Sequence, residues 1–117
     1  MNYSGKHYHY QGIGKKETLM HIGVCTIQLY MHSSRSLKDK RQILRSITDR
    51  LRQKFNVSVA EIENNDSWNT ATLGIVCLSN DRKFTNELIS KTITFVNSSR
   101  LPAEVLDIST EIISGSN

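Results

Sequence analysis

Apolar and polar residues alternate over the stretch IGVCTIQLYM, Ile22–Met31. An alternation of period two is typical of a strand with one buried face. We expect Cys25, Ile27 and Leu29 on the buried face. The same kind of pattern, bounded by turn residues, predicts further strands over Val57–Ile62, Trp68–Leu78 and Val105–Ile113.

Between these strands, apolar residues recur at helical spacing. Leu37, Leu44, Ile47, Leu51 and Phe55 predict a helix over 37–55. Ser36 is a suitable N-cap, with Asp39 three residues later. Ser79–Asp81 predicts the start of a second helix and Ser98–Ser99 its end. Its expected buried face consists of Phe84, Leu88, Thr92, Phe95 and Val96.

The order strand, helix, strand, strand, helix, strand predicts an α+β fold, the ferredoxin-like βαββαβ sandwich. Right-handed crossovers would place both helices on one face of a four-stranded antiparallel sheet of order 4-1-3-2. Residues 20–113 form this single domain. Residues 1–19 have no hydrophobic period and are expected to be a disordered leader, and residues 114–117 a flexible tail.

Charge is distributed unevenly along the chain. The net charge of the whole chain is +4. Residues 35–54 hold eight basic and two acidic residues, whereas residues 55–117 hold four basic and eight acidic ones. The basic character of the folded part therefore belongs to one helix, which says more about partners than about fold.

A helical projection of residues 37–55 places several cations on one flank. At about 100° per residue, Lys38, Arg41, Arg45 and Arg52 fall within roughly 60° of one another. Such a row suits successive phosphates. Lys40 falls on the opposite flank and Arg35 on the preceding loop. The predicted nucleic-acid-binding set is Arg35, Lys38, Lys40, Arg41, Arg45 and Arg52. The alternative is an ordinary solvated amphipathic helix.

The sheet face without helices is expected to be partly apolar, which suggests either a covering partner or simple partial exposure. Val24, Val76 and Leu78 are the predicted interface residues, in a homodimer or with another protein. Parity also assigns Val57, Val59, Glu61, Asp107 and Glu111 to this face. Its central strands lack the aromatic residues on which RNA-recognition motifs stack bases, so stacking there is not expected.

No catalytic signature is found in the sequence. Cys25 and Cys77 lie in apolar strand patterns and are expected to be buried, reduced thiols. No P-loop, dinucleotide-binding or metalloprotease motif is found, and Glu61, Glu63 and Asp66 have no nucleophile or histidine spaced to join them. We therefore expect no enzyme, cofactor, metal or small-molecule substrate. No secretory signal or membrane-length apolar run occurs, which indicates a cytoplasmic protein.

Three stretches resemble the DUF503 (YlxP-like) family: SLKDKR at 36–41, FNVSVAE at 55–61, and Trp68 to Gly74, where the family's W-x3-LG-like spacing has one more residue. The resemblance runs from about Met20 to Ile113. It implies a ferredoxin-like fold and no established activity. The family's genes often lie among bacterial translation genes, which implies a role near RNA or the ribosome.

The function expected from these features is a small noncatalytic binding module. It would dock on structured RNA or a ribosomal surface through the basic flank of the helix at 37–55. The alternative is a homodimerisation or protein-interaction module that uses the open sheet face and has no role with nucleic acid.

Overall fold

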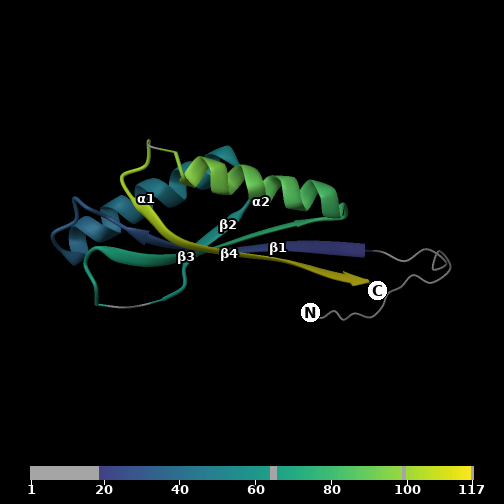
Figure 1. Cartoon of the computed structure of the whole chain (residues 1–117), viewed down its shortest axis with the longest axis horizontal. Helices are drawn as coiled ribbons and strands as arrows, with labels where there is room; N and C mark the ends of the chain where they lie inside the picture. The colour runs from purple at the N-terminus through teal and green to yellow at the C-terminus, as the bar shows by residue number, and fades with distance from the viewer. Residues whose placement is uncertain (1–18, 64–65, 99, 117) are drawn as a thin grey trace, which may run out of the picture.

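The computed structural model describes residues 19–63, 66–98 and 100–116. Its elements are β1 Leu19–Tyr30, α1 Leu37–Lys54, β2 Ser58–Glu61, β3 Thr70–Ser79, α2 Arg82–Val96 and β4 Glu104–Ser116. The sheet has the order β2-β3-β1-β4 with antiparallel neighbours, and both helices cover one face (Figure 1). The predicted α+β ferredoxin-like sandwich and its strand order are confirmed.

The two ends of the domain differ from the prediction. Leu19 already belongs to β1, and the rest of the predicted leader lies outside the described residues. The prediction of a flexible tail was wrong for residues 114–116, because Ser114 pairs with His21 and Gly115 with Met20. The His21 ring also hydrogen-bonds the Ser114 hydroxyl through Nδ1, at 2.7 Å. Small polar residues suggested fraying, but pairing with the central strand β1 overrides that local preference.

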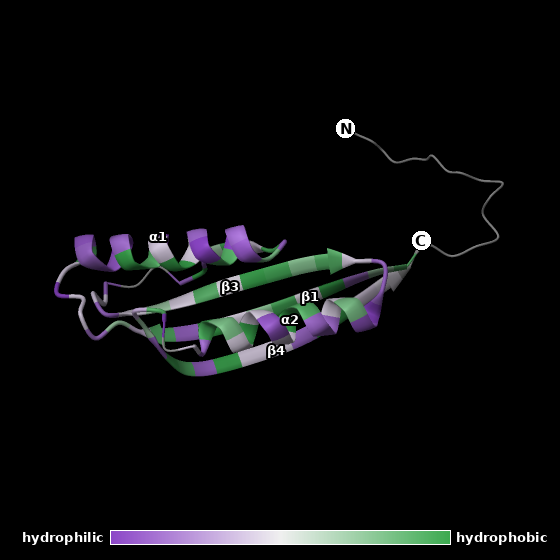
Figure 2. Cartoon of the chain, turned by 90° about the horizontal axis from the view of Figure 1, so that it is seen from above, coloured by the Kyte–Doolittle hydropathy of each residue, from purple (hydrophilic) through white to green (hydrophobic). Residues whose placement is uncertain are grey.

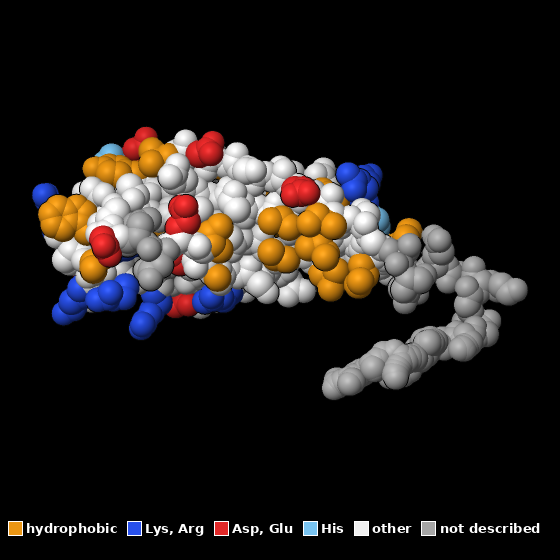
Figure 3. All heavy atoms as spheres, turned by 90° about the horizontal axis from the view of Figure 1, so that it is seen from below, with side chains coloured by type: hydrophobic (Ala, Val, Ile, Leu, Met, Phe, Trp, Pro, Cys, Tyr) orange, Lys and Arg blue, Asp and Glu red, His pale blue; other side chains and the backbone are white. Residues whose placement is uncertain are grey.

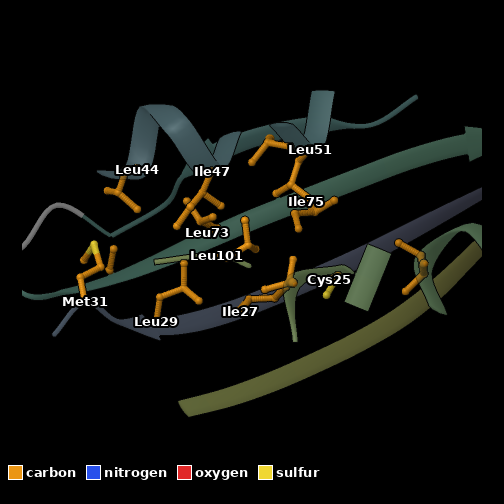
Figure 4. Close-up of a cluster of buried hydrophobic side chains, with 14 of the residues drawn as sticks. Cys25, Ile27, Leu29, Met31, Leu44, Ile47, Leu51, Leu73, Ile75 and Leu101 are labelled. Atoms are coloured by element: carbon orange, nitrogen blue, oxygen red, sulfur yellow. The ribbon is translucent and has the colours of Figure 1, made fainter. Parts of the chain in front are cut away.

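The core lies between the helices and the sheet. Cys25, Ile27 and Leu29 of β1 are at most 1% exposed, as expected from parity. They meet side chains of α1 and β3 in one buried cluster (Figure 4). Polar residues cover the outward side of α1 (Figure 2). The apolar stripe of α1 is therefore what holds it on the sheet, and its charged flanks are left for solvent or a partner.

A glycine lets α2 approach the sheet closely. A Cβ atom at Gly23 would lie 2.7 Å from Cγ1 of Ile89 and 3.0 Å from Cγ2 of Thr85. Ile89 and Thr85 are buried, whereas Phe84 is 53% exposed, so the prediction of Phe84 on the buried face was wrong. The buried stripe of α2 includes small and polar side chains that a search for large apolar residues overlooks.

The start of α1 follows the predicted capping chemistry. Ser36 Oγ accepts the backbone N–H of Asp39 at 3.0 Å. The Asp39 carboxylate accepts the backbone N–H of Arg35 at 2.9 Å. The two contacts satisfy donors that would otherwise have no partner at the helix N-terminus. They fix where α1 starts and therefore which of its flanks faces the edge of the sheet.

The side chains of the edge strand β2 point to the side of the sheet opposite to the predicted one. Val59 pairs with Ile75, whose side chain is in the core, and Val59 itself is only 6% exposed. Val57 also packs against the core. Glu61 shares this parity and contacts α1, so the assignment of Val57, Val59 and Glu61 to the open face was wrong. A shift of one residue in register reverses every side chain, and a four-residue strand gives too few positions to fix it from pattern alone.

Candidate nucleic-acid interface

Three cations of α1 form an exposed row, which we call the basic flank: Lys38, Arg41 and Arg45. No carboxylate of the described residues lies within ion-pairing distance of these three side chains. Seen from below, Lys and Arg side chains gather along the edge of the molecule where α1 lies (Figure 3). The row covers about two turns of helix, or roughly 10 Å. Its charges are therefore available to an external anion.

A shallow groove of about 380 Å³ runs between α1 and the edge strand β2. Arg41, Arg45 and Arg52 line it, together with the carboxylates of Asp49 and Glu61. The floor of the groove is therefore of mixed charge, and an anion entering it would meet two acids. The basic flank is better suited to a polyanion that lies along the outer side of the helix than to a small anion bound inside the groove.

The Arg52 side chain already makes contacts within the protein. Its Nη2 donates to the carbonyl oxygen of Val59 at 2.7 Å, and Nη1 lies 3.7 Å from Oδ1 of Asp49. The side chain is about half exposed. Arg52 thus satisfies an acceptor of the short edge strand. It can add positive charge near a bound polyanion, but its main contact in this structure is structural.

Lys40 is a correction to the predicted nucleic-acid-binding set. The residue is only 4% exposed. Its Nζ donates to the carbonyl oxygen of Ser67 at 2.9 Å and lies 3.4 Å from Oε2 of Glu61. A buried ammonium with these partners is not available to a phosphate. The sequence projection placed Lys40 beside the core stripe but could not show that the β2–β3 connection would supply acceptors for it.

Arg35 lies in the loop before α1 and is exposed. Its backbone N–H is bonded to Asp39, which ties the loop to the helix start. No ion pair of its side chain with a described residue is found. Arg35 can therefore extend the basic flank past the N-terminal end of α1, as the sequence suggested.

The open sheet face carries a contiguous apolar patch. The β1–β3 register places Val24 opposite Val76 and Ile22 opposite Leu78, and the β1–β4 register places Ile22 opposite Ile113. Leu78 is 59% exposed and Val76 39%. Figure 3 shows an apolar cluster on this face, separate from the basic edge. The apolar patch therefore consists of Ile22, Val24, Val76, Leu78 and Ile113.

The open face offers little for base stacking. Tyr30 is the only Phe, Tyr or Trp in the four strands as the structure bounds them. It lies at the end of β1, and its ring packs edge-on against His32 with centroids 4.5 Å apart. RNA-binding sheets of this topology rely on aromatics in their central strands. Contact with nucleic acid, if made, is therefore expected from the basic flank and not from the sheet.

Nothing in the described part of the chain forms a metal site or reactive thiol. No group of three or more potential ligands (His, Cys, Asp or Glu) is found among the described residues. Cys25 and Cys77 are free and buried, as predicted. Burial raises the pKa of Cys25 to about 11. Burial also raises the pKa of Cys77, against the lowering effect of a backbone hydrogen bond from Gly23. Both thiols are therefore protonated near neutral pH and poor nucleophiles.

A helix that spans a bilayer needs about 20 consecutive, mostly apolar residues. Within the described residues, neither α1 nor α2 is both long and apolar enough to cross a membrane.

Sequence reasoning missed some of the residues that the structure brings together. Ile22 has the parity of Val24, so it could have been included in the apolar patch. Ile113 has the parity of Asp107 and Glu111, so it too could have been included, because the register of the β1–β4 pair is regular from Asp107 to Ser116. Phe55 and Phe95 looked like core residues, yet both remain partly exposed where the ends of α1 and α2 meet.

Fold and site together define a small α+β sandwich with a basic helix flank on one edge and an apolar patch on its open sheet face. Residues 22–110 match DUF503, a family described as "Protein of unknown function", and the chain belongs to this family. It is 34% identical over 77 residues to the "Uncharacterized protein YlxP" of Bacillus subtilis (strain 168), covering 66% of this chain and 84% of that one.

Two designed proteins resemble the chain in structure. Foldit4 has a TM-score of 0.45 and 10% identity, over 83% of this chain and 98% of the design. Ferredog-Diesel has a TM-score of 0.39 and 13% identity, over 95% of this chain and 96% of the design.

Proposed function

We propose that the chain is a noncatalytic, cytoplasmic binding module that docks the basic flank on structured RNA or on an RNA-rich ribosomal surface. The observation that carries the proposal is the row formed by Lys38, Arg41 and Arg45, exposed and without carboxylate partners among the described residues. Successive cations on one helix face can each neutralise a phosphate and release its counterion. Arg41 and Arg45 can in addition grip phosphate oxygens in a bidentate way.

Several features favour a double-helical RNA, recognised through its phosphate backbone, over a single-stranded RNA. The strands carry one aromatic residue, Tyr30, at their margin, so unstacked bases have no platform on the sheet. The cations lie on a rigid helix capped by Ser36, which suits a rigid row of phosphates. Contacts of this kind position a protein on a duplex and carry no sequence information. The translation setting implied for the family favours RNA over DNA.

Arg41→Glu/Arg45→Glu is the variant that tests the proposal. Both side chains are exposed, so their reversal should leave the fold intact. The control is Arg82→Glu/Lys83→Glu at the start of α2, far from α1 (Figure 1), which changes the net charge by the same amount. Retention of a structured RNA on a filter at low salt should be lost in the first variant and kept in the second. Equal retention by both variants would reject the basic flank as the site.

The apolar patch supports a second function, self-association through the open sheet face. Leu78 at 59% exposure, Ile113 at 46% and Val76 at 39% are neighbours by register, together with the partly exposed Ile22 and Val24. A contiguous apolar surface of this kind is a common mark of an interface. A homodimer related by a two-fold axis would bury this patch against itself and would leave the basic flank of each copy free.

A further inference from the structure

A second groove, of about 610 Å³, lies where the C-terminal parts of α1 and α2 meet. We call it the helix-end groove. Phe55 and Phe95 form its apolar floor, with ring centroids 5.7 Å apart in an edge-to-face arrangement. Its volume falls within the range of small-molecule sites, which is roughly 300–1,000 Å³. No residue of the basic flank lines this groove, so a ligand bound in it would be independent of the proposed function.

The charged side chains that line the helix-end groove all have the same sign. Lys54, Lys91 and Arg100 line it, and no Asp or Glu does so among the described residues. The Nζ of Lys54 lies 5.6 Å from the ring centroid of Phe95 and 5.9 Å from that of Phe55. The ammonium is thus held above both rings. Its position at the last residue of α1 also suits the negative end of the helix dipole.

The dipole does not account for the other two cations. Lys91 is five residues before the end of α2, and Arg100 lies in the following connection. Neither side chain forms an ion pair with a described carboxylate. Arg100 is also held in place by its backbone, because its carbonyl oxygen accepts a hydrogen bond from Nη1 of Arg50 at 3.2 Å. Three cations beside two phenyl rings call for a ligand with more than one negative charge and a flat apolar part.

We propose that the helix-end groove binds a nucleoside phosphate. The base would pack against the part of one phenyl ring, that of Phe55 or Phe95, that the Lys54 ammonium leaves uncovered, and the phosphate would contact Lys91 and Arg100. A single carboxylate would leave most of this positive charge uncompensated, whereas a phosphate dianion offsets two of the three cations. Two sources supply this charge: a free nucleotide, whose terminal phosphate is a dianion, or an unpaired nucleotide of an RNA strand, whose two flanking phosphodiesters carry one negative charge each.

The test is a titration of the amide spectrum of the ¹⁵N-labelled full chain with AMP and GMP. Saturable shifts centred on Lys91, Phe95 and Arg100, with a Kd on the order of 1 mM or tighter, support the proposal. Inorganic phosphate and N-acetyl-phenylalanine serve as partial ligands. If no saturable shift occurs in the groove, or if either partial ligand binds as tightly as the nucleotides, the proposal is wrong.

Variants provide the second arm. Lys91→Glu/Arg100→Glu changes two exposed residues and should weaken nucleotide binding at least about tenfold with a dispersed spectrum retained. Lys83→Glu, on the same helix but outside the groove, should leave the Kd unchanged. An unchanged Kd in the double variant would overturn the proposal. A single-stranded pentanucleotide that binds at least about tenfold tighter than AMP and shifts the same amides would identify an RNA strand as the source, and equal affinity a free nucleotide.

Discussion

Lys40 and Glu61 form an ion pair across the α1–β2 contact, with Nζ 3.4 Å from Oε2. The lysine side chain is 4% exposed and the glutamate 36%. The pair joins the edge strand to the helix from inside, and it removes one cation from the surface that the sequence suggested. Only the lysine of this pair is buried, so its ammonium depends on protein acceptors, whereas the glutamate carboxylate keeps contact with water.

Replacement of Lys40 should therefore destabilise the fold. Lys40→Ala removes the donor to the Ser67 carbonyl and leaves Glu61 without its partner, for an expected loss of about 1–3 kcal/mol in the free energy of unfolding. Lys38→Ala, two residues earlier on the exposed flank, should change it by less than about 0.5 kcal/mol. Urea denaturation measures both. Equal stability of the two variants would contradict a structural role for Lys40.

Gly23 should tolerate no side chain. A Cβ there would lie 2.7 Å from Ile89 Cγ1 and 3.0 Å from Cys77 Sγ, so Gly23→Ala requires the Ile89 side chain, or the helix that carries it, to shift away from the sheet. We expect a loss of about 1–3 kcal/mol, typical of overpacked cores. Gly115→Ala is the matched control in the same sheet, because a Cβ at Gly115 meets nothing within 4 Å. Thermal denaturation that ranks the two variants equally would show that α2 does not need this close approach.

Stability should fall in alkaline solution through Cys25. Its pKa rises from 9.0 in the unfolded chain to about 11 in the fold because of burial. Below pH 9.0 the thiol is protonated in both states, and its contribution is fully present. As the pH rises toward about 11, the unfolded state ionises first, so a contribution on the order of 2–3 kcal/mol is lost.

Cys25→Ala is the control for other groups that titrate in this range. The difference in unfolding free energy between wild type and variant should shrink as the pH rises from 9.0 to about 11. A difference that stays constant over this range, measured by urea denaturation at several pH values, would mean that the thiol is not kept protonated by the fold.

Self-association through the apolar patch is tested by Val76→Lys. Val76 is exposed and central in the patch, so the substitution should not harm the monomer but should place charges face to face in a dimer. Sedimentation of the wild type at high concentration should give a dimer, and the variant a monomer. Gln53→Lys, at an exposed position of α1 on the other face of the sheet, is a control that adds the same charge and should still dimerise. A wild type that stays monomeric would remove the second candidate function.

The fold was predictable because its long elements repeat one pattern many times. β1 has ten registered pairs with β3, and α1 has an N-cap and five apolar positions at helical spacing. Each of these signals agrees with the others. The predicted orientation of β2 was wrong because four residues are too few for an alternating pattern to show which face is buried. The predicted flexible tail was wrong because pairing with β1 outweighs the polar composition of Ser114 and Gly115.

The candidate site was predictable only to the extent that helix geometry fixes the directions of the side chains. A helical wheel gives the exposure of Arg41 and Arg45 correctly because both lie outside the core stripe. It cannot show that a loop carbonyl at Ser67 captures Lys40, or that Arg52 reaches the carbonyl of Val59. The helix-end groove depends on how α1 and α2 meet, which is a tertiary contact between residues 40 positions apart in the case of Phe55 and Phe95.

The salt dependence of RNA binding tests the central claim most directly. The affinity for a hairpin RNA is measured across a range of salt concentrations for wild type, Arg41→Glu/Arg45→Glu and Arg82→Glu/Lys83→Glu. The account predicts that the slope of log K against log salt becomes shallower in the first variant, by the amount expected for the loss of about two phosphate contacts. In the second variant the slope should be unchanged. Slopes and affinities that match the wild type in the Arg41/Arg45 variant would contradict RNA docking by the basic flank.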